Sequence, residues 1–358
     1  MVKALFIYGG IDREELEKKV TQGIDPDTSF FGFNYVKKDS RIQADYLQIK
    51  KSSYKIAGWL VRKYVFLNTV YLLFALYRRI GRYDVILLTS SAYFNLLFLK
   101  KLGFFRRQRW ILFNLDLTTL LEKNKKEPFY YKLLLWTTKA ADKIICISKT
   151  QVTCLKEAAI PQERLVFIPL GVDNHFYKML PHGEDFILTV GRDIGRDFTT
   201  FLEAMKLLDE RVVIICSPKN MEGLLDKVPA NVTILYDRPY QELRSYYEKA
   251  KCFVISTKPA TYLVGSDCPG QTAILDSMAY GRAVIATYNP WFEGYFEERQ
   301  HIVTVPPEDP VALSKAVKEV MTNTELRERM VIEARKLIDT ECNSELMAKR
   351  ISEIISSV

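Results

Sequence analysis

Two arginines in the second half of the chain have the type and spacing to hold an anion. Arg192 and Arg196 lie in a glycine-containing turn that follows an apolar stretch at 186–190. Guanidinium groups bind phosphates through paired hydrogen bonds, and phosphates bind at the carboxyl ends of parallel strands. We therefore expect both arginines to hold a diphosphate. The alternative is a surface network of ion pairs with Asp193 and Asp197.

A second anion-binding group is expected at the start of a short helix. The break before residue 271 and the apolar spacing after it predict a helix over 272–280 and a buried strand over 283–286. The first N–H groups of a helix have no partner inside it, so Gly270, Gln271 and Thr272 offer backbone donors to an anion.

One acidic residue follows this helix start at a useful distance. Asp276 lies one turn beyond Thr272 on the same face of the expected helix. A carboxylate there can accept both hydroxyls of a ribose while the helix start holds the phosphates. The alternative is a simple turn glycine at position 270, followed by a solvated acidic residue at position 276.

These two stretches resemble the donor-site motifs of the family 4 retaining glycosyltransferases, which have the glycosyltransferase-B (GT-B) fold. The family shows Glu-Pro-Phe-Gly and then Leu-Glu-Ala-Met-Ala, where this chain has Cys268-Pro269-Gly270-Gln271 and Leu275-Asp276-Ser277-Met278-Ala279. By this resemblance Asp276 replaces the second glutamate, which holds the donor ribose. Cys268 replaces the first glutamate, which contacts the donor sugar. Arg192 matches the family's arginine, and Arg196 takes the place of its lysine.

The first half of the chain matches the family more loosely. Gly9 and Gly10 end the first expected strand, where glycine lets a ligand approach the backbone. The resemblance places such a loop beside the donor diphosphate, although any turn from strand to helix favours glycine. Asn114 and Asp116 close another strand, and there the resemblance implies contact with the acceptor or donor sugar. A simple helix cap explains them equally well.

Composition and charge limit the classes of function. Residues 1–170 carry a net charge of +14 and residues 171–358 a net charge of −6. Such a basic half suggests an anionic partner such as a membrane surface, a phosphate-bearing acceptor or nucleic acid. No nucleic-acid motif is present, so we expect no nucleic-acid partner. The six cysteines show no metal-binding spacing, and we expect buried thiols, a reducing cytoplasm and no bound metal.

The segment from Tyr54 to Arg82 is basic, aromatic and apolar, but polar residues interrupt it too often for a membrane span. It fits a core helix of an α/β domain, which we favour, with basic ends that touch lipid. It also fits an amphipathic helix at a membrane surface. The apolar run within residues 1–10 is too short for a signal peptide.

Strands alternate with helices along the whole chain, which predicts an α/β fold with two doubly wound parallel sheets. We expect a Rossmann-like, acceptor-binding domain over residues 1–175 and a Rossmann-like, donor-binding domain over residues 176–340. By the resemblance these domains face one another across a cleft. The resemblance also implies that residues 341–358 form a helix that packs back on the first domain.

The resemblance implies a metal-independent retaining hexosyltransferase, with Arg192, Arg196 and Asp116 in catalytic roles. The co-substrate is a nucleoside-diphosphate sugar, no cofactor is needed, and the acceptor is a saccharide or is lipid-linked. We expect a place in cell-surface glycan biosynthesis, in the cytoplasm, with peripheral contact to the inner face of the plasma membrane. The alternatives are a nucleotide-sugar epimerase of the same fold and a non-catalytic protein that binds anionic surfaces or nucleic acid.

Overall fold

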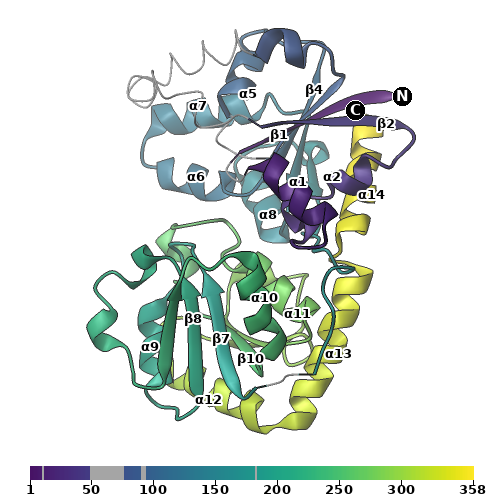
Figure 1. The fold of residues 1–358 in the computed structure, drawn as a ribbon. Coiled ribbons are helices and arrows are strands. Elements are labelled where there is room, and N and C mark those ends of the chain that lie inside the picture. The colour runs from purple at the N-terminus through teal and green to yellow at the C-terminus, as the bar shows by residue number, and fades with distance from the viewer. Residues whose placement is uncertain (10–11, 49–75, 90–93, 182–183) are drawn as a thin grey trace. The chain divides into compact units, whose positions relative to one another are not determined.

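The computed structural model describes residues 1–9, 12–48, 76–89, 94–181 and 184–358. The chain folds into two compact units, which are described separately (Figure 1). Unit 1 contains residues 1–21, 29–169 and 347–358, and unit 2 contains residues 22–28 and 170–346.

Unit 1 is built on a sheet of six parallel strands in the order β2-β1-β3-β4-β5-β6. The strands are β1 (Val2–Tyr8), β2 (Ile42–Gln48), β3 (Val85–Leu88), β4 (Arg109–Asn114), β5 (Lys143–Cys146) and β6 (Leu165–Phe167). Strand β3 is buried along its whole length, as expected for a parallel strand covered on both faces. Strand β2 was not expected from the sequence; it lies at the sheet edge, and its first four residues alternate between buried and exposed.

Helices cover both faces of this sheet (Figure 1). They are α1 (Arg13–Thr21), α2 (Phe33–Val36), α5 (Phe94–Lys101), α6 (Leu117–Asn124), α7 (Pro128–Thr138), α8 (Lys149–Glu157) and the end of α14 (Ser344–Ser357). At Gly32, a β-carbon would come within 3.0 Å of Ala348 of α14, so glycine permits this close packing.

The segment 54–82 lies largely outside the described residues. Its described end supports the core alternative, because Leu76 and Ile80 belong to the hydrophobic core of unit 1.

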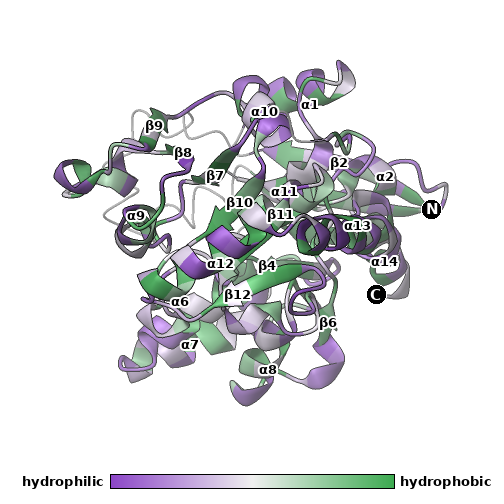
Figure 2. Ribbon diagram, turned by 90° about the horizontal axis from the view of Figure 1, so that it is seen from below, coloured by the Kyte–Doolittle hydropathy of each residue, from purple (hydrophilic) through white to green (hydrophobic). Residues whose placement is uncertain are grey.

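Unit 2 repeats the architecture with six parallel strands in the order β12-β11-β10-β7-β8-β9. They are β7 (Phe186–Gly191), β8 (Arg211–Cys216), β9 (Val232–Tyr236), β10 (Cys252–Ile255), β11 (Ala283–Thr287) and β12 (Ile302–Val305). Figure 2 shows the strands of both units as hydrophobic and the outer helix α13 as largely hydrophilic. The expected α/β fold with two parallel sheets is confirmed.

The helices of unit 2 lie on both faces of its sheet, with α9 and α12 on one face and α10 and α11 on the other (Figure 1). Their bounds are α9 (Phe198–Met205), α10 (Tyr240–Lys249), α11 (Gln271–Ala279), α12 (Pro310–Thr322) and α13 (Thr324–Thr340). Several begin at side-chain caps: the carboxylates of Asp197 and Asp309 accept from Thr200 and Ala312 N–H groups.

Candidate active site

The strand order of unit 2 reverses between β7 and β10. From β7 the chain proceeds to β8 and β9 on one side, while β11 and β12 lie beyond β10 on the other. In open α/β sheets, ligands bind at the carboxyl ends of the strands at such a switch point. The turn at 191–197 follows β7, and Ser256 and Thr257 follow β10, so both segments lie at this place.

Arg196 is a buried cation at the switch point. Its side chain is only 6% exposed, and Nη2 donates to the Val190 carbonyl at 2.6 Å. Among the described residues, Nε and Nη1 have no hydrogen-bond partner. Burial lowers the pKa of this guanidinium to about 10. Because an unpaired buried charge is costly, this arrangement is suited to an anion that completes it.

Two glycines make room for the Arg196 side chain. A β-carbon at Gly191 would collide with Nε, and one at Gly270 would come within 3.3 Å of Nη1. The guanidinium therefore lies between the end of β7 and the start of α11, and it has room there because both neighbouring positions are glycine.

Two further buried hydroxyls lie next to this arginine in the fold. Thr257 forms an isolated antiparallel bridge with Arg196, and Ser256 O accepts from the Asp197 N–H at 3.0 Å. The hydroxyls of Ser256 and Thr257 have no partner among the described residues. Sequence reasoning did not select either residue, because serine and threonine after a strand are common in any fold.

The start of α11 supplies the expected backbone donors. Gly270 has a φ of +82° and precedes the helix, while Gln271 is buried and Thr272 is exposed. In the described parts of the chain, the N–H groups of Thr272 and Ala273 have no acceptor. These donors and the helix dipole favour a bound anion. Cys268 lies just before this turn, is buried and forms no disulfide.

The two acidic residues of the Arg192–Arg196 turn do not pair with its arginines. Asp193 accepts from the N–H groups of Gly195 and Ser266, at 2.6 and 3.0 Å, and so ties the turn to the loop before α11. Asp197 caps α9. The alternative of a surface ion-pair network with these two residues is therefore wrong.

Arg192 differs from Arg196 in its surroundings. Its side chain is 62% exposed, and its Nε lies 3.2 Å from Asp237 Oδ1 in an exposed ion pair. The sequence motifs give the two arginines the same expected role. In the structure, Arg196 is the buried one of the two, and two of its nitrogens have no hydrogen-bond partner within the described part of the chain.

Asp276 is buried on α11 and is not the solvated residue of the alternative interpretation. Its Oδ1 accepts from the Tyr177 hydroxyl at 2.6 Å. Burial raises the pKa of Asp276 to about 7, and the hydrogen bond from Tyr177 opposes that rise. Sequence reasoning missed Tyr177, because no local spacing links it to a residue 99 positions away.

Tyr247 of α10 connects the two charged groups electrostatically. Burial and the charge of Asp276 raise the pKa of Tyr247, while the Arg196 cation lowers it. Its ring stacks on Tyr280 at 5.2 Å and on Phe253 at 5.2 Å. Arg196 and Asp276 therefore act on the same buried phenol, although no ion pair joins them.

The candidates of unit 1 lie at the carboxyl edge of its own sheet. Gly9 follows β1, and Gly10 lies outside the described residues. The Asn114 side chain accepts from the Leu117 N–H at 2.9 Å and so caps α6, which confirms the cap interpretation for this residue. Asp116 occupies the N-cap position of α6, but its side chain makes no capping bond.

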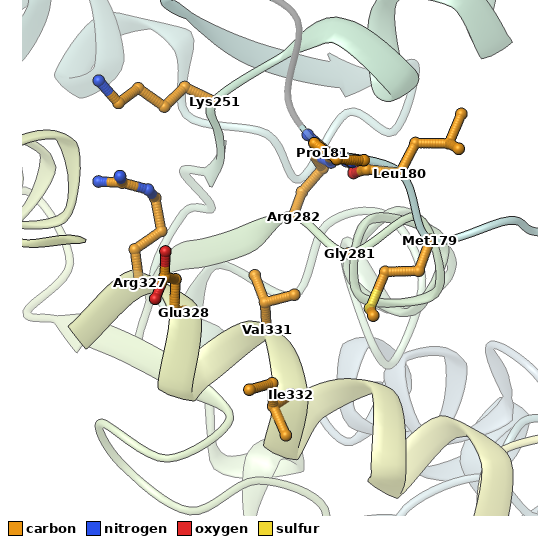
Figure 3. Close-up of a pocket in the computed structure, with 10 residues that line it drawn as sticks. All are labelled: Met179, Leu180, Pro181, Lys251, Gly281, Arg282, Arg327, Glu328, Val331 and Ile332. Atoms are coloured by element: carbon orange, nitrogen blue, oxygen red, sulfur yellow. The ribbon is translucent and has the colours of Figure 1, made fainter. Parts of the chain in front are cut away.

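A separate hollow of about 410 Å³ lies at the opposite, amino edge of the unit 2 sheet. Figure 3 shows Val331 and Ile332 of α13 beside it, together with Lys251, Arg282 and Arg327. These cations already have partners: Arg282 and Arg327 bind backbone carbonyls, and Lys251 pairs with Asp185. The hollow therefore lies apart from the carboxyl edge that carries Arg196 and the start of α11.

The described residues contain no cluster of three or more His, Cys, Asp or Glu side chains placed to hold a metal ion. In the same part of the chain, no helix has the length and apolar character to cross a bilayer.

Models of two protein families match the chain. The family described as "Glycosyl transferases group 1" matches residues 184–323, and "Glycosyltransferase Family 4" matches residues 49–176. No curated protein sequence matches the chain.

Solved structures of similar fold cover essentially the whole chain. HepE from Anabaena in complex with UDP-glucose is 13% identical, with a TM-score of 0.74 and coverage of 100% of both chains. Sucrose-phosphate synthase from Thermosynechococcus elongatus is 16% identical, with a TM-score of 0.75 and coverage of 100% of this chain and 99% of that one. WaaG, described as a glycosyltransferase involved in lipopolysaccharide biosynthesis, is 14% identical, with a TM-score of 0.65 and full coverage of both chains. At these identities the likeness shows the fold, and together with the matched family models it identifies the chain as a glycosyltransferase of group 1 and family 4 with the GT-B fold.

Proposed function

We propose that this glycosyltransferase retains the anomeric configuration and takes a hexose from a nucleoside-diphosphate sugar. The observation that carries the proposal is the buried guanidinium of Arg196, with two unpaired nitrogens, beside the free N–H groups at the start of α11. A diphosphate supplies the acceptor oxygens that both groups lack. HepE was solved with UDP-glucose, which supports a uridine donor for this chain.

Each residue of the edge then has a distinct role. Arg196 and the α11 N-terminus bind the diphosphate, and the Ser256 and Thr257 hydroxyls complete its hydrogen bonds. Arg192 closes over the phosphates from the exposed side after leaving Asp237. Asp276 accepts the ribose hydroxyls.

The chemistry follows from where negative charge develops. As the bond between the anomeric carbon and the diphosphate breaks, charge grows on the departing oxygen, next to Arg196 and the helix start. Fixed positive groups at that place stabilise the transition state more than the bound donor. The acceptor oxygen forms its bond on the face that the diphosphate leaves, and the acceptor proton passes to the departing phosphate oxygen. This front-face course rests on the resemblance to retaining enzymes.

We expect the purified protein to bind UDP-sugars and to transfer the sugar in the presence of a chelator. Two arginines and a helix terminus neutralise the phosphates in this proposal, so neither a metal nor another cofactor is required. Thermal-shift assays with UDP-, ADP-, GDP- and dTDP-sugars, with and without EDTA, measure the binding. Product analysis with and without saccharide acceptors measures the transfer.

Three outcomes would contradict parts of this proposal. A folded protein that binds and turns over none of the nucleotide sugars would refute the donor assignment. Activity lost in EDTA and restored by manganese would refute metal independence. A changed sugar configuration without any acceptor would indicate an epimerase.

The acceptor in this proposal is a saccharide or is lipid-linked, and the protein acts at the cytoplasmic membrane surface in glycan biosynthesis. On α7, Phe129, Lys132 and Trp136 share one exposed face, and Phe129 is 82% exposed. The Lys101 ammonium at the end of α5 lies 5.5 Å from the Trp136 ring. Exposed aromatic and basic residues together suit an anionic lipid surface.

We expect the protein to co-sediment with vesicles rich in phosphatidylglycerol at low salt, but not with phosphatidylcholine vesicles. Each basic residue near an anionic surface contributes about 1 kcal/mol, so the combined change Phe129→Ser and Lys132→Glu should weaken binding at least about tenfold. Ile332→Ser, at an exposed position of unit 2, is the control and should bind as the wild type does. If the wild type stays in the supernatant, the membrane proposal is wrong and a soluble saccharide acceptor is favoured.

A further inference from the structure

A chain of hydrogen-bonded phenols leads to the carboxylate of Asp276. The Tyr177 hydroxyl donates to Oδ1 at 2.6 Å, the Tyr240 hydroxyl donates to Tyr177 at 3.2 Å, and Tyr240 lies 3.4 Å from the Tyr280 hydroxyl. Within the described parts of the chain, Tyr177 is the one side chain that donates a hydrogen bond to Asp276. The second carboxylate oxygen of Asp276 therefore remains available to another hydrogen-bond donor.

The position of Tyr177 is fixed by contacts that do not involve Asp276. Its side chain is 2% exposed, and its ring meets Tyr280 edge to face at 4.7 Å. Arg335 of α13 donates to the Tyr177 carbonyl at 3.0 Å and to the Ala279 carbonyl at 2.8 Å. The same guanidinium therefore ties the Tyr177 backbone to the end of α11, the helix that carries Asp276.

Among the residues that the structure describes, no cation pairs with Asp276. The nearby cations are engaged elsewhere: Arg244 of α10 pairs with Glu248, and Arg335 of α13 pairs with Asp339. The other titratable groups that face Asp276 are neutral phenols, namely Tyr240 and Tyr247 from α10 and Tyr280 from the end of α11. Charge stabilisation of the buried carboxylate therefore depends on the Tyr177 hydroxyl.

We propose that Tyr177 is a positioning residue of the donor site, whose hydroxyl holds one oxygen of Asp276 and turns the other toward the ribose hydroxyls. The inference rests on the proposed function and names the group that holds Asp276 in position to bind the ribose. Aspartate is one methylene shorter than the glutamate that the resemblance expects, so its reach is smaller and its direction matters more. A rigid phenol supplies that direction from a segment far away in the sequence.

The arrangement makes donor binding depend on pH in a defined direction. An ionised carboxylate accepts from both ribose hydroxyls, whereas a protonated one offers fewer acceptor sites. Burial raises the pKa of Asp276 to about 7, so donor affinity should rise as the pH rises through about 7. Removing the Tyr177 hydroxyl takes away the group that lowers this pKa, so the midpoint should move to higher pH by about one to two units.

Tyr177→Phe tests the proposal, with Tyr240→Phe as the matched control that leaves the Asp276 hydrogen bond in place. Two quantities are measured from pH 5.5 to 9.5: the affinity for UDP by calorimetry, and the carboxyl ¹³C resonance of Asp276, assigned from its absence in Asp276→Asn. In Tyr177→Phe we expect both midpoints to rise, with UDP binding about tenfold weaker at pH 7 and recovered above pH 9. In Tyr240→Phe both midpoints should stay within about 0.3 pH units of the wild type, because the hydrogen bond from Tyr177 to Asp276 is kept. A shift of that size is about a twofold change in the ionisation equilibrium.

The outcomes separate this inference from the function on which it rests. If the wild type binds UDP and the Asp276 midpoint is the same in Tyr177→Phe, the positioning role is wrong. A loss of affinity that is equal at every pH indicates a purely structural effect and also overturns it. If the resonance moves as expected but the wild type binds none of UDP, ADP, GDP or dTDP, the donor site itself is wrong, and the ribose role falls with it.

Discussion

Replacing Arg196 by methionine is expected to lower kcat/KM for the donor about 100- to 1,000-fold, the usual effect of removing one charge-stabilising donor. Because Arg196 is buried with two unpaired nitrogens, the same change should leave the thermal unfolding temperature unchanged or raise it. A buried charge whose only hydrogen bond among the described residues is to the Val190 carbonyl costs free energy, and an apolar side chain of similar length removes that cost. Activity and stability should therefore move in opposite directions. Steady-state kinetics and thermal unfolding of the donor-free protein measure the two effects.

Arg282→Met is the matched control for this substitution. Arg282 is equally buried, and burial likewise lowers its pKa to about 10, but it donates to the carbonyls of Ala250, Tyr280 and Leu180. Its loss should cost about 2–4 kcal/mol of stability, because buried carbonyls lose a charged donor. Donor affinity of the folded protein should not change, since Arg282 lies at the amino edge of the sheet.

Comparison of Arg196→Met with Arg282→Met tests whether Arg196 binds the diphosphate. Normal turnover in Arg196→Met would show that this cation does not act on the diphosphate. A marked loss of stability in Arg196→Met, comparable to that in Arg282→Met, would show a structural role. Arg192→Ala should also reduce turnover, but less, because the Arg192 side chain is exposed to solvent and pairs with Asp237 in this structure.

Gly270→Ala is expected to weaken donor binding at least about tenfold and to destabilise the protein by about 1–2 kcal/mol. The residue has a φ of +82°, which alanine adopts at a cost, and the new methyl would come within 2.8 Å of Ile255 Cγ2. Relief of that contact displaces the start of α11, whose N–H groups are expected to face the diphosphate. Calorimetry with UDP and thermal unfolding measure the two effects.

Gly281→Ala provides the comparison at the other end of the same helix. Gly281 also has a positive φ, of +73°, and its added methyl meets Met179, a flexible side chain that can move. Stability should fall by a similar amount, whereas UDP affinity should stay within about twofold, since the helix start is undisturbed. Equal losses of affinity in both variants would show that helix strain, and not the anion site, controls binding.

Much of the fold follows from local patterns in the sequence. Apolar runs such as 283–286 predict strands buried on both faces, and the break at Pro269 and Gly270 predicts the start of α11 at nearly the observed residue. Strand β2 and helix α6 were missed, because only one side of each is buried. Local apolar periodicity is weak in such elements, and tertiary contacts decide their structure.

The candidate site was predictable only as far as its motifs reach. The motifs indicate Arg192, Arg196 and Asp276, but not which arginine is buried, because that depends on the space left by two glycines, of which Gly270 is far from the turn in sequence. The contact between Tyr177 and Asp276 joins two segments that share no spacing rule. Burial of the carboxylate, and hence its raised pKa, likewise arises only when the phenols of α10 and the 177 segment close around α11.

The division of the chain into units limits what can be learned by cutting it. The chain passes from one unit to the other at residues 21/22, 28/29, 169/170 and 346/347, so neither unit is one continuous segment. In unit 2, Asp27 accepts from the Ser344 hydroxyl at 2.7 Å, across 317 positions of sequence. A fragment that begins at residue 170 lacks Asp27 and carries the end of α14 without the surface it covers in unit 1. Such a fragment would leave apolar residues such as Ile351 in water, which makes it prone to aggregate for reasons unrelated to its nucleotide site. Separate study of the donor half therefore calls for a permuted chain that joins residues 22–28 to residues 170–346.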